Sequence, residues 1–207
     1  MAETSLSENL ANSGPYRLLV STRNAHKVGE IRQILGSSFE VMDLTSVPQV
    51  PEVEETETTF EGNATLKAVA ASLVFDGWVI ADDSGLEVDA LNGAPGVYSA
   101  RYAGENAGDK DNNRLLLKNL DCVLDRRARF HCVIVLARGG RKLAAFDGTV
   151  EGRIIDAEDG AGGFGYDPLF IPEGYDQTFG VLPSEVKNAL SHRAKALEKL
   201  SQWRGWY

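Results

Sequence analysis

Cysteine and long apolar runs are both scarce in this chain of 207 residues. Cys122 and Cys132 are too few for a disulfide framework, and with three histidines that show no ligand spacing they argue against a zinc site. No apolar run is long enough to span a bilayer, so we expect no membrane partner. Residues 1–15 are polar and acidic and lack a signal-peptide pattern, which predicts a disordered tail on a cytoplasmic protein.

Runs of lysine or arginine are lacking too. The net charge is −9, from 21 basic and 30 acidic side chains. A nucleic acid polymer needs a basic surface that neutralises its phosphates, so we expect no such partner. A small anion remains possible if a few lysines are well placed and a divalent cation helps.

What is present is an ordinary globular composition, with 43% hydrophobic and 25% charged residues. Strand-like apolar runs and helical spacings mix along residues 16–207, which we interpret as a single domain. We expect strands at 16–22, 39–44, 78–86, 129–138 and 142–155, and helices at 28–35, 58–75, 109–120 and 183–203. The last two strands are expected to be antiparallel neighbours. The mixture predicts an α/β fold with a mixed sheet.

The loop STRNAHK follows the first expected strand and brings Thr22, Asn24 and Lys27 to the start of a helix. A hydroxyl, an amide and an ammonium at a helix N-terminus suit a bound phosphate. The loop has neither a Walker nor a Rossmann glycine pattern, so alone it leaves the phosphate hypothesis open.

The segment ADDSG places Asp82 and Asp83 side by side. Adjacent carboxylates repel each other and need a cation, a proton or water. One interpretation is a solvated turn in which Asp82 is a cap. The other is an Mg²⁺ site that leaves one carboxylate to orient a water, with Glu54 or Glu55 from the acidic loop completing the oxygen shell.

Lys67 lies on an expected helix that is otherwise rich in alanine. Such a lysine usually extends to solvent, but it can also reach a phosphate. The start of this helix is predicted near Thr58, which begins a capping-box spacing.

The segment GGFGYDPLF combines three glycines with Phe164, Tyr166 and Asp167. Glycines allow unusual backbone conformations and close approach, and the aromatic rings offer stacking faces. The alternative is a plain turn that leads into a strand.

The segment KNALSHR holds Lys187, His192 and Arg193, which would point in different directions along one unbroken helix. They converge only if the helix breaks at Ser191, a good N-cap for a new helix. Otherwise they form a solvated basic face.

Together these segments offer the parts of a nucleotide site, and they carry a family resemblance. STRNAHK, EETETTFEGNATLKA, ADDSGLEVDALNGAPGVYSARYAG, GGFGYDPLF and KNALSHRAKAL resemble, in order, the Ham1 family of noncanonical purine nucleoside triphosphate pyrophosphatases. The resemblance runs from about Arg17 to about Leu200. It implies a two-lobed α/β fold around a long, mixed, twisted sheet flanked by helices. It also implies a homodimer, Mg²⁺ as cofactor, and conversion of ITP, dITP or XTP to the monophosphate and pyrophosphate.

The resemblance further assigns residues by motif position. It implies that Asp83, Lys67 and Glu55 are catalytic, with Asp83 as proton acceptor, and that Glu55 (or Glu54) and Asp83 meet the metal. The residues implied to bind the triphosphate are Thr22, Arg23, Asn24, Ala25, His26, Lys27 and Lys67. Those implied to contact the rest of the substrate are Ser84, Phe164, Gly165, Tyr166, Asp167, Lys187, His192 and Arg193.

The chain departs from the family pattern at Arg23, where glycine is common, and at Val181 and Pro183, where a more helical lead-in is common. These departures concern the shape of the phosphate loop and the start of the last helical stretch. Two rival functions are a Maf-like nucleotide pyrophosphatase and a regulatory module that binds nucleotide without catalysis.

Overall fold

The computed structural model describes residues 15–206, so the predicted tail at 1–15 lies, except for Pro15, outside the described residues. Six strands form one sheet in the order β2-β1-β3-β4-β5-β6. Their bounds are β1 Tyr16–Val20, β2 Phe39–Asp43, β3 Trp78–Val88, β4 Arg127–Arg138, β5 Arg141–Ile154 and β6 Phe170–Pro172. The sheet is mixed, because β1 pairs in parallel with β2 and β3 while the pairs from β3 to β6 are antiparallel. The predicted fold class is confirmed.

Five α-helices and several short 3₁₀ turns accompany the sheet in the described part of the chain. The α-helices are α1 Ala25–Leu35, α2 Phe60–Ser72, α3 Asp109–Asn119, α4 Ser184–Leu190 and α5 His192–Ser201. The 3₁₀ turns are η2 Gly36–Ser38, η3 Leu44–Ser46, η4 Asp89–Leu91, η5 Gly96–Arg101, η6 Asp167–Leu169 and η7 Arg204–Trp206. No helix among these residues is both long and apolar enough to cross a membrane.

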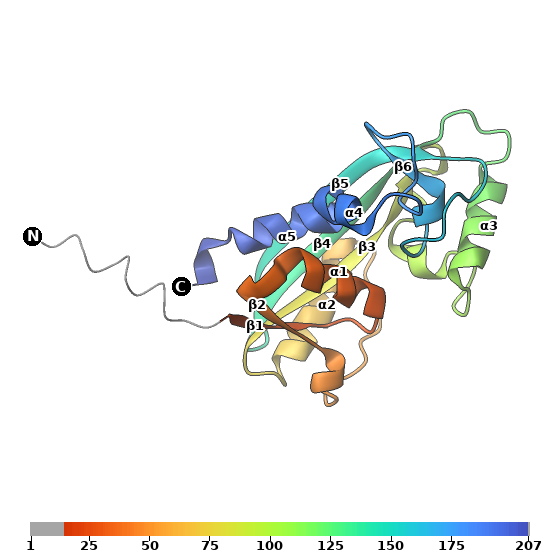
Figure 1. Cartoon of the computed structure of the whole chain (residues 1–207). Helices are drawn as coiled ribbons and strands as arrows, with labels where there is room; N and C mark the ends of the chain where they lie inside the picture. The colour runs from red at the N-terminus through yellow and green to blue at the C-terminus, as the bar shows by residue number, and fades with distance from the viewer. Residues whose placement is uncertain (1–14, 207) are drawn as a thin grey trace, which may run out of the picture.

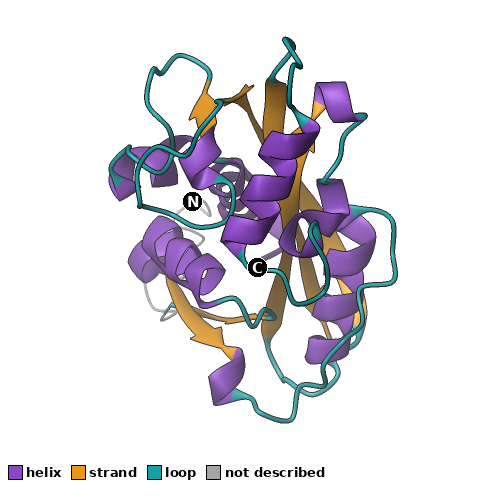
Figure 2. Cartoon of the chain, turned by 90° about the vertical axis from the view of Figure 1, so that its right-hand side faces the viewer, coloured by secondary structure: helices purple, strands orange, loops and turns teal. Residues whose placement is uncertain are grey.

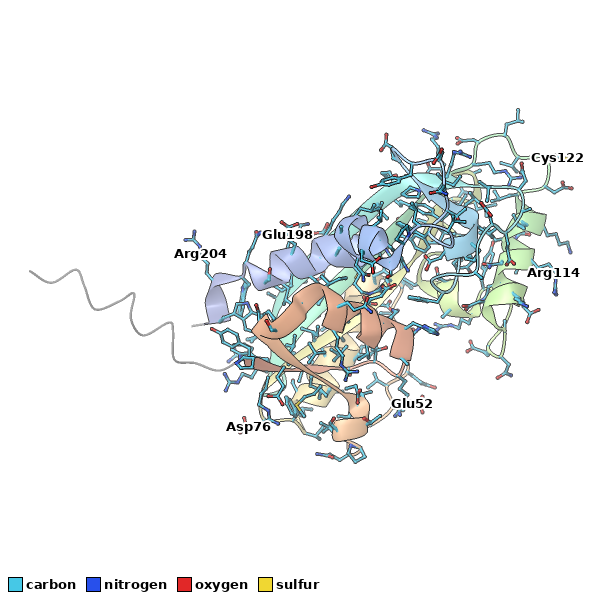
Figure 3. The ribbon with its side chains drawn as sticks, viewed as in Figure 1. Glu52, Asp76, Arg114, Cys122, Glu198 and Arg204 are labelled. Atoms are coloured by element: carbon cyan, nitrogen blue, oxygen red, sulfur yellow. The ribbon has the colours of Figure 1, made fainter. Side chains whose placement is uncertain are left out.

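The molecule is elongated, and β3, β4 and β5 run through its length (Figure 1). At one end they carry β1, β2, α1 and α2, and at the other they carry β6 and α3. Cys122 lies at the surface of the α3 end (Figure 3), and Cys132 is buried in β4, so both thiols are free.

Helices cover both faces of the sheet (Figure 2). Apolar residues of α1 and α5 pack with Ile80 and Ile134 in one core cluster, whereas α2 packs with Ala81 and Val133 in another. Successive strand residues point to opposite faces, so α1 and α5 lie on one face and α2 on the other. The crossover from β1 through α1 to β2 and the crossover from β2 through α2 to β3 therefore lie on opposite faces of the sheet. The carboxyl end of β1 lies between them, the place where open α/β sheets bind ligands.

The strand β3 is longer than predicted, because ADDSG does not end it. It pairs with β1 only at residues 78–80 and with β4 along residues 79–88. Beyond the end of β1, one edge of β3 is therefore not covered by that strand. The two aspartates lie in this stretch, with their side chains on opposite faces of the sheet.

The caps of two helices decide how the site is assembled. The helix α2 begins one residue later than predicted: Thr59, not Thr58, has the extended backbone of an N-cap and accepts from the Gly62 amide at 3.1 Å. Two adjacent threonines offer the same hydroxyl, so the sequence does not distinguish them. The expected helix at 183–203 is two helices, and of the two alternatives the break at Ser191 is the one present: this residue ends α4 and caps α5 by accepting from the Ala194 amide at 3.2 Å.

Candidate active site

A cleft beyond the carboxyl end of β1 gathers most of the predicted site residues. Those that line it are Thr22, Asn24, Lys27, Glu55, Lys67, Asp83, Ser84, Phe164, Gly165, Tyr166, Asp167, Lys187, His192 and Arg193. They come from both ends of the chain and from both faces of the sheet. We call the part around Lys67, Asp83 and Glu55 the phosphate end, and the part around Phe164, Lys187 and Arg193 the base end.

Four predicted residues do not line the cleft. Arg23 is exposed and its guanidinium lies 3.7 Å from the Glu52 carboxylate. Ala25 and Glu54 are exposed. The His26 ring stacks on Phe164 at the rim, with ring centroids 5.4 Å apart, and so joins the start of α1 to the glycine-rich loop.

The start of α1 has the build of an anion site. The Asn24 side-chain oxygen accepts from the backbone amides of His26 and Lys27 at 2.9 and 3.1 Å, and the Thr22 hydroxyl accepts from the Asn24 amide. These contacts fix the first turn, where the remaining amides and the helix dipole favour negative charge. The predicted cradle therefore has the expected local geometry.

Lys67 does not extend to solvent: only 15% of its side chain is exposed. Its ammonium donates to Glu55 Oε1 at 2.7 Å, to Asp83 Oδ1 at 3.0 Å and to the Asp82 carbonyl at 3.2 Å. Burial alone would lower the pKa of Lys67, but the carboxylates of Asp83 and Glu55 raise it, so the lysine is charged.

The two acids at this end titrate differently. Burial raises the pKa of Asp83, and the nearby ammonium of Lys67 offsets only part of this effect. Burial also acts on Glu55, but Lys67 holds the pKa of that carboxyl below its ordinary value. A carboxylate with a raised pKa inside a cleft is a candidate proton acceptor, which agrees with the role predicted for Asp83.

The phosphate end also fits a hard divalent cation. Mg²⁺ is commonly held by one or two carboxylates together with the phosphates of its substrate. Glu55 and Asp83 converge on the same ammonium, so they can converge on a metal. No group of three or more acidic, histidine or cysteine side chains in residues 15–206 forms a metal cage by itself, so the phosphates would have to supply further ligands. The exposed Glu54 is less well placed than Glu55.

At the base end, the glycine-rich loop is tied to the last helices through Asp167. Its buried carboxylate accepts from the Phe164 amide at 2.8 Å and from the Lys187 ammonium at 2.5 Å. Gly163 has φ of +71°, and a Cβ there would lie 2.0 Å from Asp167 Oδ2. The loop can close around this carboxylate only because that position is glycine.

The rings at the base end have distinct partners. The Lys187 ammonium lies over the Phe164 ring, 4.8 Å from the ring centroid, and Phe164 lines the cleft. His192 stacks on Phe130 at 5.0 Å and its Nδ1 has no partner among the described residues. Burial lowers the pKa of His192 well below its ordinary value, so the ring is neutral. Tyr166 donates its hydroxyl to the Ser99 carbonyl at 2.8 Å, which anchors the loop.

The local architecture thus holds two kinds of group in one cleft: cations and acids that suit a triphosphate, and donors beside an aromatic ring that suit a base. The sequence model of the Ham1 family matches residues 18–203. The chain belongs to the Ham1 family. Among curated relatives, the dITP/XTP pyrophosphatase of Geobacter sulfurreducens is 50% identical over 193 residues, covering 92% of this chain and 97% of the relative. That of Exiguobacterium sibiricum is 50% identical over 187 residues, covering 89% and 94%.

Solved structures of the Ham1 family share this fold. The Ham1 protein of Staphylococcus aureus superposes with a TM-score of 0.80 at 43% identity, over 89% of this chain and 95% of that one. The nucleoside-triphosphatase, or dITP/XTP pyrophosphatase, of Mycobacterium abscessus gives a TM-score of 0.72 at 40% identity, over 90% and 100%.

The departures from the Ham1 pattern leave the cleft complete. Arg23 turns to the surface, so its bulk does not enter the phosphate loop. Pro183 immediately precedes α4, where its missing amide removes no helical hydrogen bond. Lys187 still reaches the cleft from α4.

Glu30 was not recognised from the sequence, and the role of Asp82 was left open. Glu30 accepts from the Lys187 ammonium at 2.6 Å and from Arg193 Nη1 at 2.5 Å. It follows Lys27 by three positions, so the helical spacing could have placed both on the cleft side of α1. Asp82 is fully buried in β3, and the interpretation of this residue as a cap in a solvated turn is wrong.

Proposed function

We propose that the chain hydrolyses noncanonical purine nucleoside triphosphates (ITP, dITP and XTP) to the monophosphate and pyrophosphate, and so removes them from the nucleotide pool. The proposal rests on family membership, on relatives that are dITP/XTP pyrophosphatases at 50% identity, and on one structural observation. That observation is a single cleft in which Lys67, Asp83 and Glu55 lie together with Lys187 and Arg193.

In this proposal Lys67, Lys27 and the start of α1 bind the triphosphate. Asp83 accepts a proton from a water that attacks the α-phosphorus. A new bond forms between that phosphorus and the water oxygen, the bond to the bridging oxygen breaks, and pyrophosphate leaves. A bound Mg²⁺, held by Glu55 and Asp83, would neutralise phosphate oxygens.

Selection of the base rests on groups that can only donate. A 6-keto purine presents an acceptor where adenine presents an amino group, so lysine and arginine favour the keto form. Lys187 uses two of its three N–H groups on Glu30 and Asp167. Arg193 donates hydrogen bonds to Asp82, Glu30 and Ser84. The few N–H groups left over are the ones available to the base, and an opposed donor there would be rejected strongly.

The direct test is pyrophosphate release from ITP, dITP, XTP, GTP and ATP at equal concentration, with Mg²⁺ and after its removal by a chelator. We expect rapid release from the first three only, and none without the metal. Release that does not favour ITP, dITP and XTP over GTP and ATP would instead favour another nucleotide pyrophosphatase, such as a Maf-like enzyme. Tight binding without release would favour a regulatory module.

We further propose that the protein is a cytoplasmic homodimer. A groove on the α2 side is lined by Phe60, Pro95, Val97 and Tyr98, and Tyr98 is 53% exposed. Tyrosine is enriched at protein interfaces. Light scattering of the purified chain gives the mass, and Tyr98→Glu should shift a dimer toward monomer.

A further inference from the structure

Asp82 lies at the centre of the site but cannot contact a substrate. It is 0% exposed. In the β3–β4 register Asp82 is opposite Ile134 and Asp83 is opposite Val133. Residues paired in this way share a face, so Asp82 points toward α1 and α5 while Asp83 points toward α2. The adjacent acids therefore serve different sides of the sheet.

The carboxylate of Asp82 is saturated by donors. Its Oδ1 accepts from Lys27 Nζ at 2.5 Å and from Ser84 Oγ at 2.9 Å. Its Oδ2 accepts from Arg193 Nε at 2.8 Å and from Cys132 Sγ at 3.0 Å. Burial would raise the pKa of Asp82, but Arg193 and Lys27 hold it well below the ordinary value, so the group is an anion.

The partners of Asp82 belong to opposite ends of the proposed substrate. Lys27 is at the triphosphate, whereas Arg193 is at the base. Glu30 differs, because it bridges Arg193 and Lys187, which are both at the base end. Asp82 is thus the buried anion that the two ends share.

We propose that Asp82 is a positioning residue that couples reading of the base to binding of the triphosphate. This inference rests on the proposed function. By taking Nε of Arg193, Asp82 fixes the plane of the guanidinium and hence the direction of its remaining N–H groups. By sharing the same carboxylate between Arg193 and Lys27, it sets how strongly Lys27 is held back from the phosphates. A change at one end therefore alters the other.

The principal test is Asp82→Asn, which keeps the shape and removes the charge. Without the anion, Arg193 is no longer aimed, so the ratio of kcat/KM for ITP to that for ATP should fall about tenfold or more. Lys27 is released at the same time, so inorganic pyrophosphate, measured by calorimetry with Mg²⁺, should bind at least as tightly as to the wild type. Loss of packing alone would weaken both properties together.

The matched control is Cys132→Ala, which removes one donor to Asp82 but no hydrogen bond to Lys27 or Arg193. It should leave the ITP-to-ATP ratio and pyrophosphate affinity unchanged. An unchanged ratio in Asp82→Asn would overturn the proposal, as would a parallel loss of both readouts with a lowered melting temperature.

A second variant applies if Asp82→Asn does not fold. Arg193→Lys keeps the charge but frees part of the Asp82 carboxylate, which then holds Lys27 more strongly. Affinity for pyrophosphate, which is too short to reach the base end, should fall about tenfold, within the usual range of coupling between sites. Unchanged affinity for pyrophosphate in Arg193→Lys would overturn the proposed coupling through Asp82 but not the proposed function. A wild-type chain that releases no pyrophosphate from ITP would overturn the proposed function as well.

Discussion

At the base end of the cleft, the side chains of Arg193 and Lys187 are 1% and 6% exposed, and each bonds to two carboxylates. At the phosphate end, Lys67 and Glu55 are 15% and 28% exposed. The base end is a closed network whose geometry is set before a substrate arrives. The phosphate end is more open, and the proposed binding of a triphosphate and a metal would require its ion pairs to be rearranged.

This difference separates selection from turnover. Preorganised donors in a dry site discriminate well, because a wrong group leaves buried polar atoms unpaired. The partly exposed Glu55 and Lys67 beside the buried Asp83 can instead exchange partners during a reaction. Substitutions at the base end should therefore change which substrate is used, and those at the phosphate end should change how fast any substrate reacts.

The largest expected effect is at the phosphate end. Asp83→Asn removes the proton acceptor but keeps its shape, so kcat should fall about 10²–10⁴-fold, the usual cost of losing a general base. The nucleotide affinity should be largely kept. Steady-state kinetics with ITP measure this, with the exposed Asp111→Asn as control. Near-full kcat in Asp83→Asn would contradict the assignment.

At the base end, Arg193→Lys should change selection. A lysine cannot bond at once to Asp82, Glu30, Ser84 and a keto oxygen, so the ITP-to-ATP ratio of kcat/KM should fall about tenfold, the value of one charged hydrogen bond. Lys199→Ala on the same helix, whose ammonium pairs with Asp147 at the surface, is the matched control. A constant ratio would restrict Arg193 to phosphate binding.

Lys67→Met tests the phosphate end through pH. Burial raises the pKa of Asp83, and Lys67 opposes this shift, so its removal should raise that pKa further. The base acts when deprotonated, so kcat/KM falls as pH drops through this pKa, and the acid limb should move to higher pH in the variant. KM for ITP should also rise by about tenfold, because one phosphate partner is lost. If the acid limb of the kcat/KM profile did not move, Lys67 would not influence the pKa of the catalytic base.

The last comparison distinguishes two neighbours. Glu55→Gln should weaken activation by Mg²⁺ about tenfold, because a charged metal ligand becomes neutral. Glu54→Gln should leave activation unchanged, since Glu54 is exposed outside the cleft. Turnover of the two variants is titrated against Mg²⁺. Equal effects of Glu55→Gln and Glu54→Gln would contradict the assignment of Glu55 as the metal ligand.

The sequence predicts the fold well where local signals agree. The break at Ser191 and the two long antiparallel strands follow from capping chemistry and apolar runs. The extent of β3 does not follow, because an acidic, glycine-containing segment is typical of a strand end. Here Asp82 is buried by cations from α1 and α5, which are distant in the sequence.

Site residues with a recognisable motif were found, but their partners were not. Glu30 and Asp82 make the base end closed, yet Glu30 was indistinguishable from a surface acid in the sequence, and Asp82 was expected only as a cap or as part of a metal-binding pair. Their role depends on the packing of α1 against α5, a long-range contact that no local pattern encodes.

The most direct test of the account is hydrolysis of ITP in water labelled with a heavy oxygen isotope. If Asp83 directs water to the α-phosphorus, the label must appear in the monophosphate and pyrophosphate must be unlabelled. ATP under the same conditions should give little of either product. Label in pyrophosphate or in free phosphate would contradict the proposed chemistry, and equal turnover of ATP would contradict the role of the closed base end.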